Sequence, residues 1–107
     1  MKIPDSLTPE AFSRFMGWPE PVEYRGDTRI GPDEERSVPW EYMTWHTEWL
    51  LGCIVSRIHE IGARICVYDN GVSLAADGIG YGHGYGEPLE AAWCAVVAAG
   101  LVPEVTP

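Results

Sequence analysis

Glycine occupies every second position from Gly78 to Gly86, in the stretch GIGYGHGYG. In an extended strand this period would place all the glycines on one face, so that another backbone or a partner could approach that face closely. A loop is the alternative interpretation, and its amides would precede the N-terminus of the apolar segment that begins at Pro88. The two interpretations differ in structure, but both make this segment the first candidate site.

Sequence patterns around the glycine segment predict three helices in a single domain over residues 1–107. Thr8 and Gly17 are typical start and stop residues for the first helix, and Pro88 and Gly100 for the last. Leucines and isoleucines at three- and four-residue spacing predict the central helix, with Thr44 or Thr47 as its cap. The predicted helices span 9–16, 44–61 and 88–99.

A β-hairpin is predicted over residues 64–76, because Asn70-Gly71 is typical of a two-residue turn. This turn would pair Val67 with Leu74 and Ile65 with Ala76. Residues 79–85 are a candidate third strand. The fold class that follows is α+β, a small antiparallel sheet sandwiched by about three helices. Residues 19–39 carry four prolines, two glycines and dense charge, and they predict an irregular connector with a candidate edge strand at 22–25.

Four segments carry a resemblance to a known family: FSRFMGW, TWHTEWLLGCIVSRI, RICVYDNGVSLAA and GYGEPLEAAWCAVVAAGL. They resemble the opening helix, central helix, hairpin and closing helix of the phage ABA sandwich domain family, small proteins of bacteriophages and prophages. The resemblance implies a small antiparallel sheet covered by helices and a phage origin. It implies no agreed activity and no catalytic residues.

The charge and cysteine content narrow the classes of function. Sixteen acidic residues against seven basic ones give a net charge of −9 and argue against direct nucleic-acid binding, because phosphates would be repelled. Three widely spaced cysteines among apolar neighbours predict buried, reduced thiols. No apolar run is long enough to span a bilayer. We therefore expect a cytoplasmic protein without membrane contact, in the host bacterial cytoplasm if it is phage-encoded.

The glycine segment matches neither of the two common phosphate-binding motifs. No trio of glycines has the G-x-G-x-x-G spacing, and the Gly-Lys-Ser/Thr of a Walker loop is missing. A ligand site remains one hypothesis, with bases stacked on tyrosines and phosphates held by amides; a packed connector is the other. The candidate ligand residues are Gly80, Tyr81, Gly82, His83, Gly84, Tyr85 and Gly86. The candidate phosphate partners are Arg25, Arg29, Arg36 and Arg57.

Aromatic residues are dense before and within the central helix, where Trp40, Tyr42, Trp45 and Trp49 follow one another closely. Trp45 and Trp49 are four positions apart, which predicts one helical face. We interpret these tryptophans first as core packing, and an exposed remainder would mark an interface or a ligand contact. No histidine lies in a metal-binding spacing. We expect no metal, no cofactor and no catalytic residue, and therefore a protein that is not an enzyme.

Two functions follow as hypotheses. The first is a non-catalytic phage-type protein that counteracts host defence by sequestering a small nucleotide-type molecule at the glycine segment. The alternative is an acidic inhibitor or adaptor, in one version a nucleic-acid mimic, that acts on a host protein through its negative charge and the segment GPDEERS. The last helix is apolar on nearly every side, which predicts a homo-oligomer that covers it.

Overall fold

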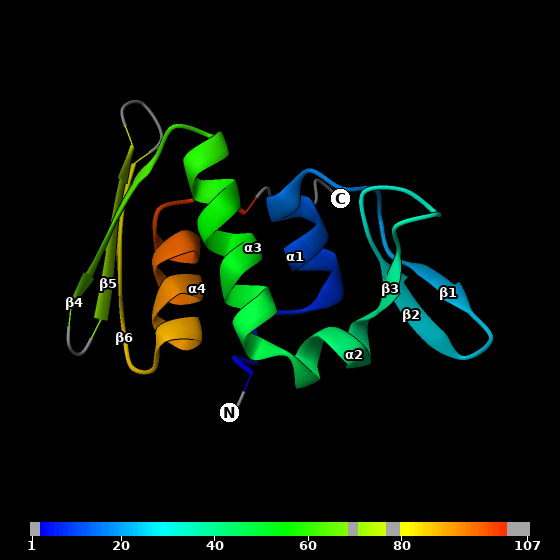
Figure 1. Ribbon diagram of the computed structural model, residues 1–107. Coiled ribbons are helices and arrows are strands. Elements are labelled where there is room, and N and C mark those ends of the chain that lie inside the picture. Colours follow the sequence, from blue (N-terminus) through cyan, green and yellow to red (C-terminus); the bar gives the residue numbers. More distant parts are fainter. Residues whose placement is uncertain (1–2, 69–70, 77–79, 103–107) are drawn as a thin grey trace.

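The computed structural model describes residues 3–68, 71–76 and 80–102, and it has a mixed α+β fold with helices between two small antiparallel sheets (Figure 1). Strand order is β1-β2-β3 in one sheet and β4-β5-β6 in the other. The first half of the chain forms α1 (Pro9–Met16), β1 (Val22–Tyr24), β2 (Asp27–Ile30), β3 (Val38–Pro39) and α2 (Trp40–Trp45). The second half forms α3 (Thr47–Glu60), β4 (Arg64–Tyr68), β5 (Gly71–Ala76), β6 (Gly80–Tyr85) and α4 (Pro88–Ala98).

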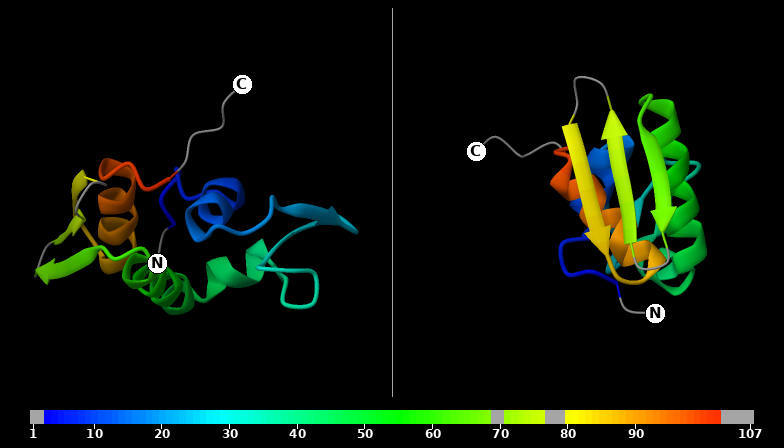
Figure 2. Two further views of the ribbon diagram at one scale, coloured as in Figure 1. Left: turned by 90° about the horizontal axis from the view of Figure 1, so that it is seen from above. Right: turned by 90° about the vertical axis from the view of Figure 1, so that its left-hand side faces the viewer.

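The predicted fold class is confirmed, but the order of the layers differs from the prediction. Helices α3 and α4 lie on one face of the β4–β5–β6 sheet, and Figure 2 shows no described element over the other face. The molecule is elongated, 40 × 30 × 25 Å, with the two sheets at opposite ends (Figure 1). None of the helices in the described part of the chain has the length and apolarity needed to span a bilayer.

Helix α1 begins and ends where the sequence predicts. The Thr8 hydroxyl accepts a hydrogen bond from the amide of Ala11 at 3.1 Å, which satisfies one free donor of the first turn. Gly17 has a left-handed φ of 73°, and the amide of Trp18 donates to the carbonyl of Ser13. Gly100 ends α4 in the same way. These local signals mark the ends of both helices.

The predicted helix over 44–61 is in fact two helices, α2 and α3, that meet at His46 (Figure 1). His46 has non-helical angles, φ −116° and ψ 69°, and its amide bonds to the carbonyl of Met43. Neither Thr44 nor Thr47 caps a helix, since the Thr44 hydroxyl donates to the carbonyl of Glu41 instead. Met43 of α2 and Leu50 of α3 are both buried.

The hairpin forms, but its register differs from the predicted one by two residues. Ile65 pairs with Leu74 and Val67 with Val72, so the turn is centred one residue earlier than Asn70-Gly71. Residues 69 and 70 lie outside the described residues. A shift of two preserves the alternation of faces, and the same residues of β5 therefore still point to the core. The candidate third strand is confirmed as β6, which pairs with β5 and places Leu74 opposite Gly82.

The glycine alternation is explained by the close packing of β6 on α4. A Cβ atom on Gly82 would lie 1.9 Å from the carbonyl oxygen of Ala95, and one on Gly84 would lie 2.0 Å from that of Ala91. Only glycine allows the strand and helix backbones to approach so closely. The alternation thus serves internal packing on this face of the strand.

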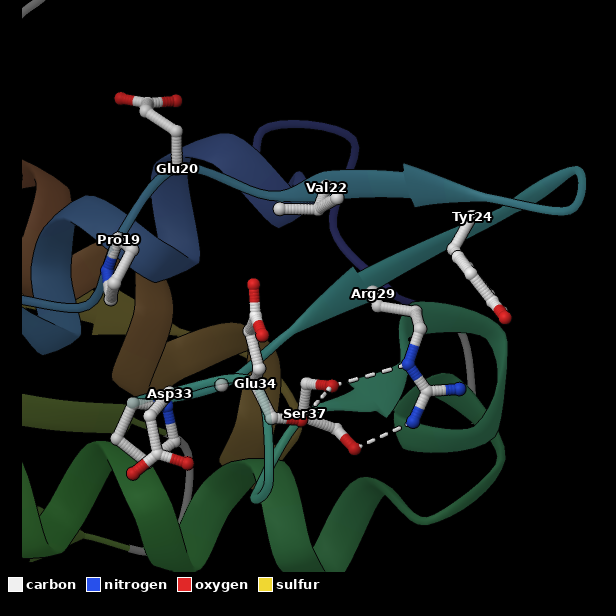
Figure 3. Close-up of a pocket in the computed structure, with 10 residues that line it drawn as sticks. Pro19, Glu20, Val22, Tyr24, Arg29, Asp33, Glu34 and Ser37 are labelled. Carbon is white, nitrogen blue, oxygen red and sulfur yellow. Dashed lines mark hydrogen bonds between the residues drawn. The ribbon is translucent and has the colours of Figure 1, made fainter.

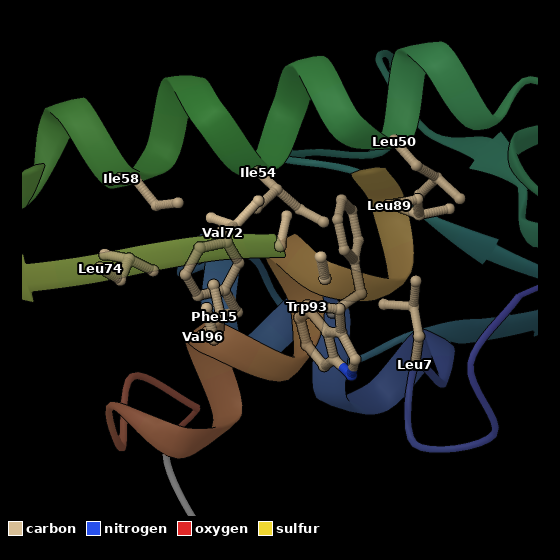
Figure 4. Close-up of a cluster of buried hydrophobic side chains, with 14 of the residues drawn as sticks. Leu7, Phe15, Leu50, Ile54, Ile58, Val72, Leu74, Leu89, Trp93 and Val96 are labelled. Atoms are coloured by element: carbon tan, nitrogen blue, oxygen red, sulfur yellow. The ribbon is translucent and has the colours of Figure 1, made fainter. Parts of the chain in front are cut away.

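The core lies between α1, α3, α4 and the inner face of β5 (Figure 4). Trp93 is fully buried at its centre, and its indole N–H donates to the hydroxyl of Ser6 at 3.0 Å. Just over half of the α4 residues are buried within one chain, and the exposed ones are Pro88, Glu90, Cys94, Val97 and Ala98. Much of the apolarity of α4 therefore has an internal explanation, and the homo-oligomer stays a prediction.

The segment 19–39 contains a three-stranded sheet, where the sequence predicted an irregular connector with a candidate edge strand at 22–25. The edge strand is confirmed as β1, while β2 and β3 were not predicted. Tyr24 pairs with Asp27 across a two-residue turn, and the turn residues Arg25 and Gly26 both have positive φ, 52° and 85°. Such a turn matches the twist of a hairpin. Arginine is uncommon at a positive φ, so the sequence did not predict this turn.

Candidate binding site

A groove of about 700 Å³ lies between the β1–β2 hairpin and the loop that connects β2 to β3 (Figure 3). The hairpin contributes one side, because Val22 pairs with Arg29 and both residues face the groove together with Tyr24. The loop contributes the other side. The lining residues are Pro19, Glu20, Val22, Tyr24, Arg29, Gly31, Pro32, Asp33, Glu34 and Ser37.

Arg29 holds the loop against the sheet. Its Nε donates to the Ser37 hydroxyl at 3.2 Å and its Nη2 to the Ser37 carbonyl at 2.7 Å (Figure 3). The Ser37 hydroxyl in turn donates to the carbonyl of Glu34 at 3.0 Å. At Gly31 a Cβ would lie 2.7 Å from the carbonyl oxygen of Arg36, so glycine lets the loop fold back closely. The groove is therefore shaped by bonds within the chain.

Asp33 and Arg36 stabilise the tip of this loop. The Asp33 carboxylate accepts from the backbone amide of Arg36 at 2.9 Å and from its Nε at 2.8 Å. These bonds lower the pKa of Asp33 below its ordinary value, and the same pair raises the pKa of Arg36. Both side chains are exposed to solvent, so the pair fixes the loop geometry more than it stabilises the fold.

The walls of the groove are apolar, while its charge is mainly negative. Val22 and Tyr24 are 60% and 55% exposed, which is high for large apolar side chains. The lining includes three carboxylates, those of Glu20, Asp33 and Glu34, and one guanidinium, that of Arg29, which is a formal charge of −2 for these residues. Asp33 is paired with Arg36 and Glu20 lies 3.7 Å from Arg14, so Glu34 supplies the carboxylate that no ion pair recorded among the described residues engages. A ligand that combines apolar groups with a cationic group matches this lining.

The four arginines proposed as phosphate partners do not gather around the glycine segment. Arg29 lies in β2, Arg36 lies in the loop that follows β2, and the Arg25 guanidinium lies 5.3 Å from the centre of the Tyr24 ring. All three belong to the β1–β2–β3 sheet or its connections, at the opposite end of the molecule from β6 (Figure 1). Arg57 instead donates to the carbonyl of Phe15 at 2.9 Å, where it supports the end of α1.

The predicted ligand segment is a strand over 80–85, and Gly86 follows it with a φ of 112°. Its glycine face is filled by α4 at Gly82 and Gly84, so no ligand could occupy that side. The side chains of Tyr81, His83 and Tyr85 lie outside the described part of the structure. A ligand contact with these three side chains is therefore untested. The groove described above lies at the other end of the chain's fold.

The aromatic cluster divides between core and surface. Trp40 is partly buried, with its ring centre 5.8 Å from that of Phe12. Trp45 is 72% exposed and Trp49 43% exposed, so the core interpretation is wrong for these two. Trp45 is the last residue of α2 and Trp49 belongs to α3, so the two tryptophans lie on two helices where the sequence predicted one.

The cysteines differ from the expectation of three buried thiols. Cys66 and Cys94 are exposed, and Cys53 is partly buried. Burial raises the pKa of the Cys53 thiol, which lowers the fraction present as the reactive thiolate. Among the described residues, no group of three or more histidines, cysteines and carboxylates could hold a metal ion.

Sequence reasoning named Arg29 and the acidic segment GPDEERS but missed Val22, Tyr24 and Ser37 as parts of one site. The signal for them was the short alternation on either side of Arg25-Gly26, which is weak without a recognisable turn. In comparisons with known proteins, no family model matches the chain, and no curated protein or solved structure is significantly similar to it. The resemblance to phage ABA sandwich proteins stays a prediction.

Proposed function

We propose that the protein is a non-catalytic binding protein that takes an extended, basic segment of another protein into the β1–β2 groove. The observation that carries this proposal is the combination of apolar walls with an excess of carboxylates in a groove of about 700 Å³. The proposal develops the adaptor hypothesis, and it uses the GPDEERS segment on which that hypothesis depended.

The shape and chemistry of the groove favour a peptide. Tyr24 and two prolines, Pro19 and Pro32, offer the flat apolar surfaces on which extended, proline-containing segments pack. Glu34 takes part in no ion pair recorded for the described residues, and it can receive a lysine or arginine of the ligand. The remaining nitrogen of Arg29 is available for a backbone carbonyl of the same peptide.

Charge supports a protein ligand over the nucleotide-type ligand of the first hypothesis. A phosphate in the groove would meet three carboxylates, and Arg36 is already engaged by one of them. The chain carries a net charge of −9, which attracts basic proteins and repels phosphates over the range of a Debye length. A role in counteracting host defence remains a prediction from the family resemblance.

The test is an NMR titration with two matched hexapeptides, Ac-Pro-Lys-Leu-Pro-Lys-Leu-NH2 and the version with glutamate in place of lysine, together with ADP. We expect the lysine peptide alone to shift the backbone amides of residues 20–37 in a saturable manner at 0.15 M salt. Saturable binding of ADP at these amides, or equal binding of both peptides, would contradict the proposal.

Two variants and one control connect the titration to the groove. Tyr24→Ala removes an apolar wall, and Glu34→Gln removes the available carboxylate; each should weaken binding about three- to tenfold, since each contact contributes on the order of 1 kcal/mol. Glu35→Gln makes the same charge change on the neighbouring residue, which does not line the groove. If Glu35→Gln weakens binding as much as Glu34→Gln, the attraction is a general effect of negative charge.

A further inference from the structure

A second exposed aromatic group lies outside the groove, at the junction of α2 and α3. It consists of Tyr42, Trp45, His46 and Trp49, and we refer to it as the aromatic elbow. Tyr42, Trp45 and Trp49 are 46%, 72% and 43% exposed. The ring centre of Tyr42 lies 4.5 Å from that of His46 and 6.0 Å from that of Trp49, so Tyr42 connects the other two rings. A contiguous aromatic surface of this kind is unusual on a soluble chain and typically marks an interaction site.

The local fold explains why these rings point outward. Met43 and Leu50 take the inward positions of α2 and α3 and are almost completely buried. The exposed Tyr42, Trp45 and Trp49 follow one another at three- and four-residue spacing, the spacing of one helical side, and Met43 and Leu50 occupy the inward side of the same two helices. The core at α2 and α3 is thus filled by Met43 and Leu50, and it does not require the aromatic rings.

The charges around the aromatic elbow identify the chemistry of its occupant. Glu41 and Glu48 are exposed beside the rings, and the sequence from Ser37 to Ser56 contains no lysine or arginine. Aromatic faces and carboxylates both attract cations, and guanidinium groups stack well on tryptophan and tyrosine. A second copy of this chain is a poor occupant, because each copy carries a net charge of −9.

We propose that the aromatic elbow is a second docking surface, which receives an arginine-bearing surface of a partner protein through stacking of guanidinium groups on Tyr42, Trp45 and Trp49. This proposal goes beyond the groove and does not require that the groove binds a peptide. Its carboxylates, those of Glu41 and Glu48, lie close enough in sequence to the rings to add charge attraction at the same surface.

The test uses the indole N–H signals of the five tryptophans as reporters. The protein is titrated with Ac-Gly-Arg-Gly-Arg-Gly-NH2 and with the peptide in which citrulline, the neutral isostere, replaces arginine. We expect the arginine peptide to shift the signals of Trp45 and Trp49, while the signal of Trp93, which is bonded to Ser6 in the core, stays unchanged. The citrulline peptide should bind at least threefold more weakly.

Variants decide whether the aromatic elbow is the site. Trp45→Ala and Trp49→Ala should each weaken binding of the arginine peptide about two- to fivefold, the contribution of one exposed cation–π contact. Val97→Ala, which truncates an exposed apolar residue on α4, should leave it unchanged. Equal binding of the citrulline peptide, or unchanged binding to both tryptophan variants, would overturn the proposal.

A second copy of the chain is the remaining possible occupant of the aromatic elbow, and it is tested separately. Light scattering at 0.1–1 mM protein should give the mass of a single chain for the wild type. A dimer that Trp45→Ala dissociates would show that a second copy occupies the aromatic elbow, and it would overturn the proposal. Binding in the groove is measured at the amides of residues 20–37, whereas binding of the arginine peptide is measured at the indoles of Trp45 and Trp49. The two proposals can therefore fail independently.

Discussion

Replacing Gly82 by alanine tests the explanation of the glycine alternation. The new Cβ would lie 1.9 Å from the carbonyl oxygen of Ala95 and 2.7 Å from the amide nitrogen of Ala99, whereas ordinary contact begins at 3.4 Å. The difference of about 1.5 Å must come from separation of β6 and α4, because the opposing atoms are backbone. Overpacking of a core costs about 1–3 kcal/mol, and we expect about 3 kcal/mol here, since no flexible side chain can yield.

The effect is measurable by thermal unfolding followed by circular dichroism. For a chain of this size, 1 kcal/mol corresponds to about 4–8 °C in Tm, so Gly82→Ala should lower Tm by about 12–24 °C. The matched control is Gly52→Ala in the middle of α3, where a Cβ meets nothing within 4 Å and the glycine is exposed. This control should stabilise the protein by about 0.5–1 kcal/mol. A Tm for Gly82→Ala within about 3 °C of the wild type would refute the packing explanation.

Three further predictions concern single side chains. Arg57→Met removes the donor to the carbonyl of Phe15 and should lower the free energy of unfolding by about 1–2 kcal/mol in urea denaturation; no change would mean that water replaces the guanidinium. The pKa of Asp33 is lowered in the folded state, so its contribution to stability is present above its ordinary pKa of 3.8 and is lost as pH falls through the lowered value; Arg36→Gln should raise the NMR titration midpoint of Asp33 towards 3.8. Iodoacetamide at pH 8 should alkylate Cys53 last of the three cysteines in a mass-spectrometric time course, because burial raises its thiol pKa; modification of Cys53 first would contradict that account.

Features that depend on contacts between residues close in sequence were predicted correctly, and features that depend on more distant contacts were not. Thr8, Gly17 and Gly100 act through bonds to residues within one helical turn, and these helix ends were predicted correctly. The break at His46 was not predicted, because neither proline nor glycine marks the position at which the chain leaves the helical conformation. The register of the hairpin depends on where its turn is centred, and a shift of two leaves the hydrophobic pattern unchanged.

The candidate site was predictable only in part for the same reason. Its acidic loop is visible in the sequence as GPDEERS, but the opposing wall requires Val22 and Tyr24 to be brought across from β1. The bond from Arg29 to Ser37 spans eight residues, and no local pattern signals it. The glycine segment was predicted as a site because of its composition. On its described face, however, the glycines are needed for close contact with the backbone of α4.

The β1–β2–β3 sheet is joined to the rest of the protein by very little buried surface. Ile30 is its one buried residue, and all three residues of β1 are exposed. Such a unit opens locally at a lower free energy than global unfolding, and its amides should exchange with solvent sooner than those of α4. Binding of a ligand to this sheet would therefore be opposed by the conformational entropy that the sheet loses when it becomes ordered. Substitutions of Ile30 would then change the affinity even though Ile30 does not contact the ligand.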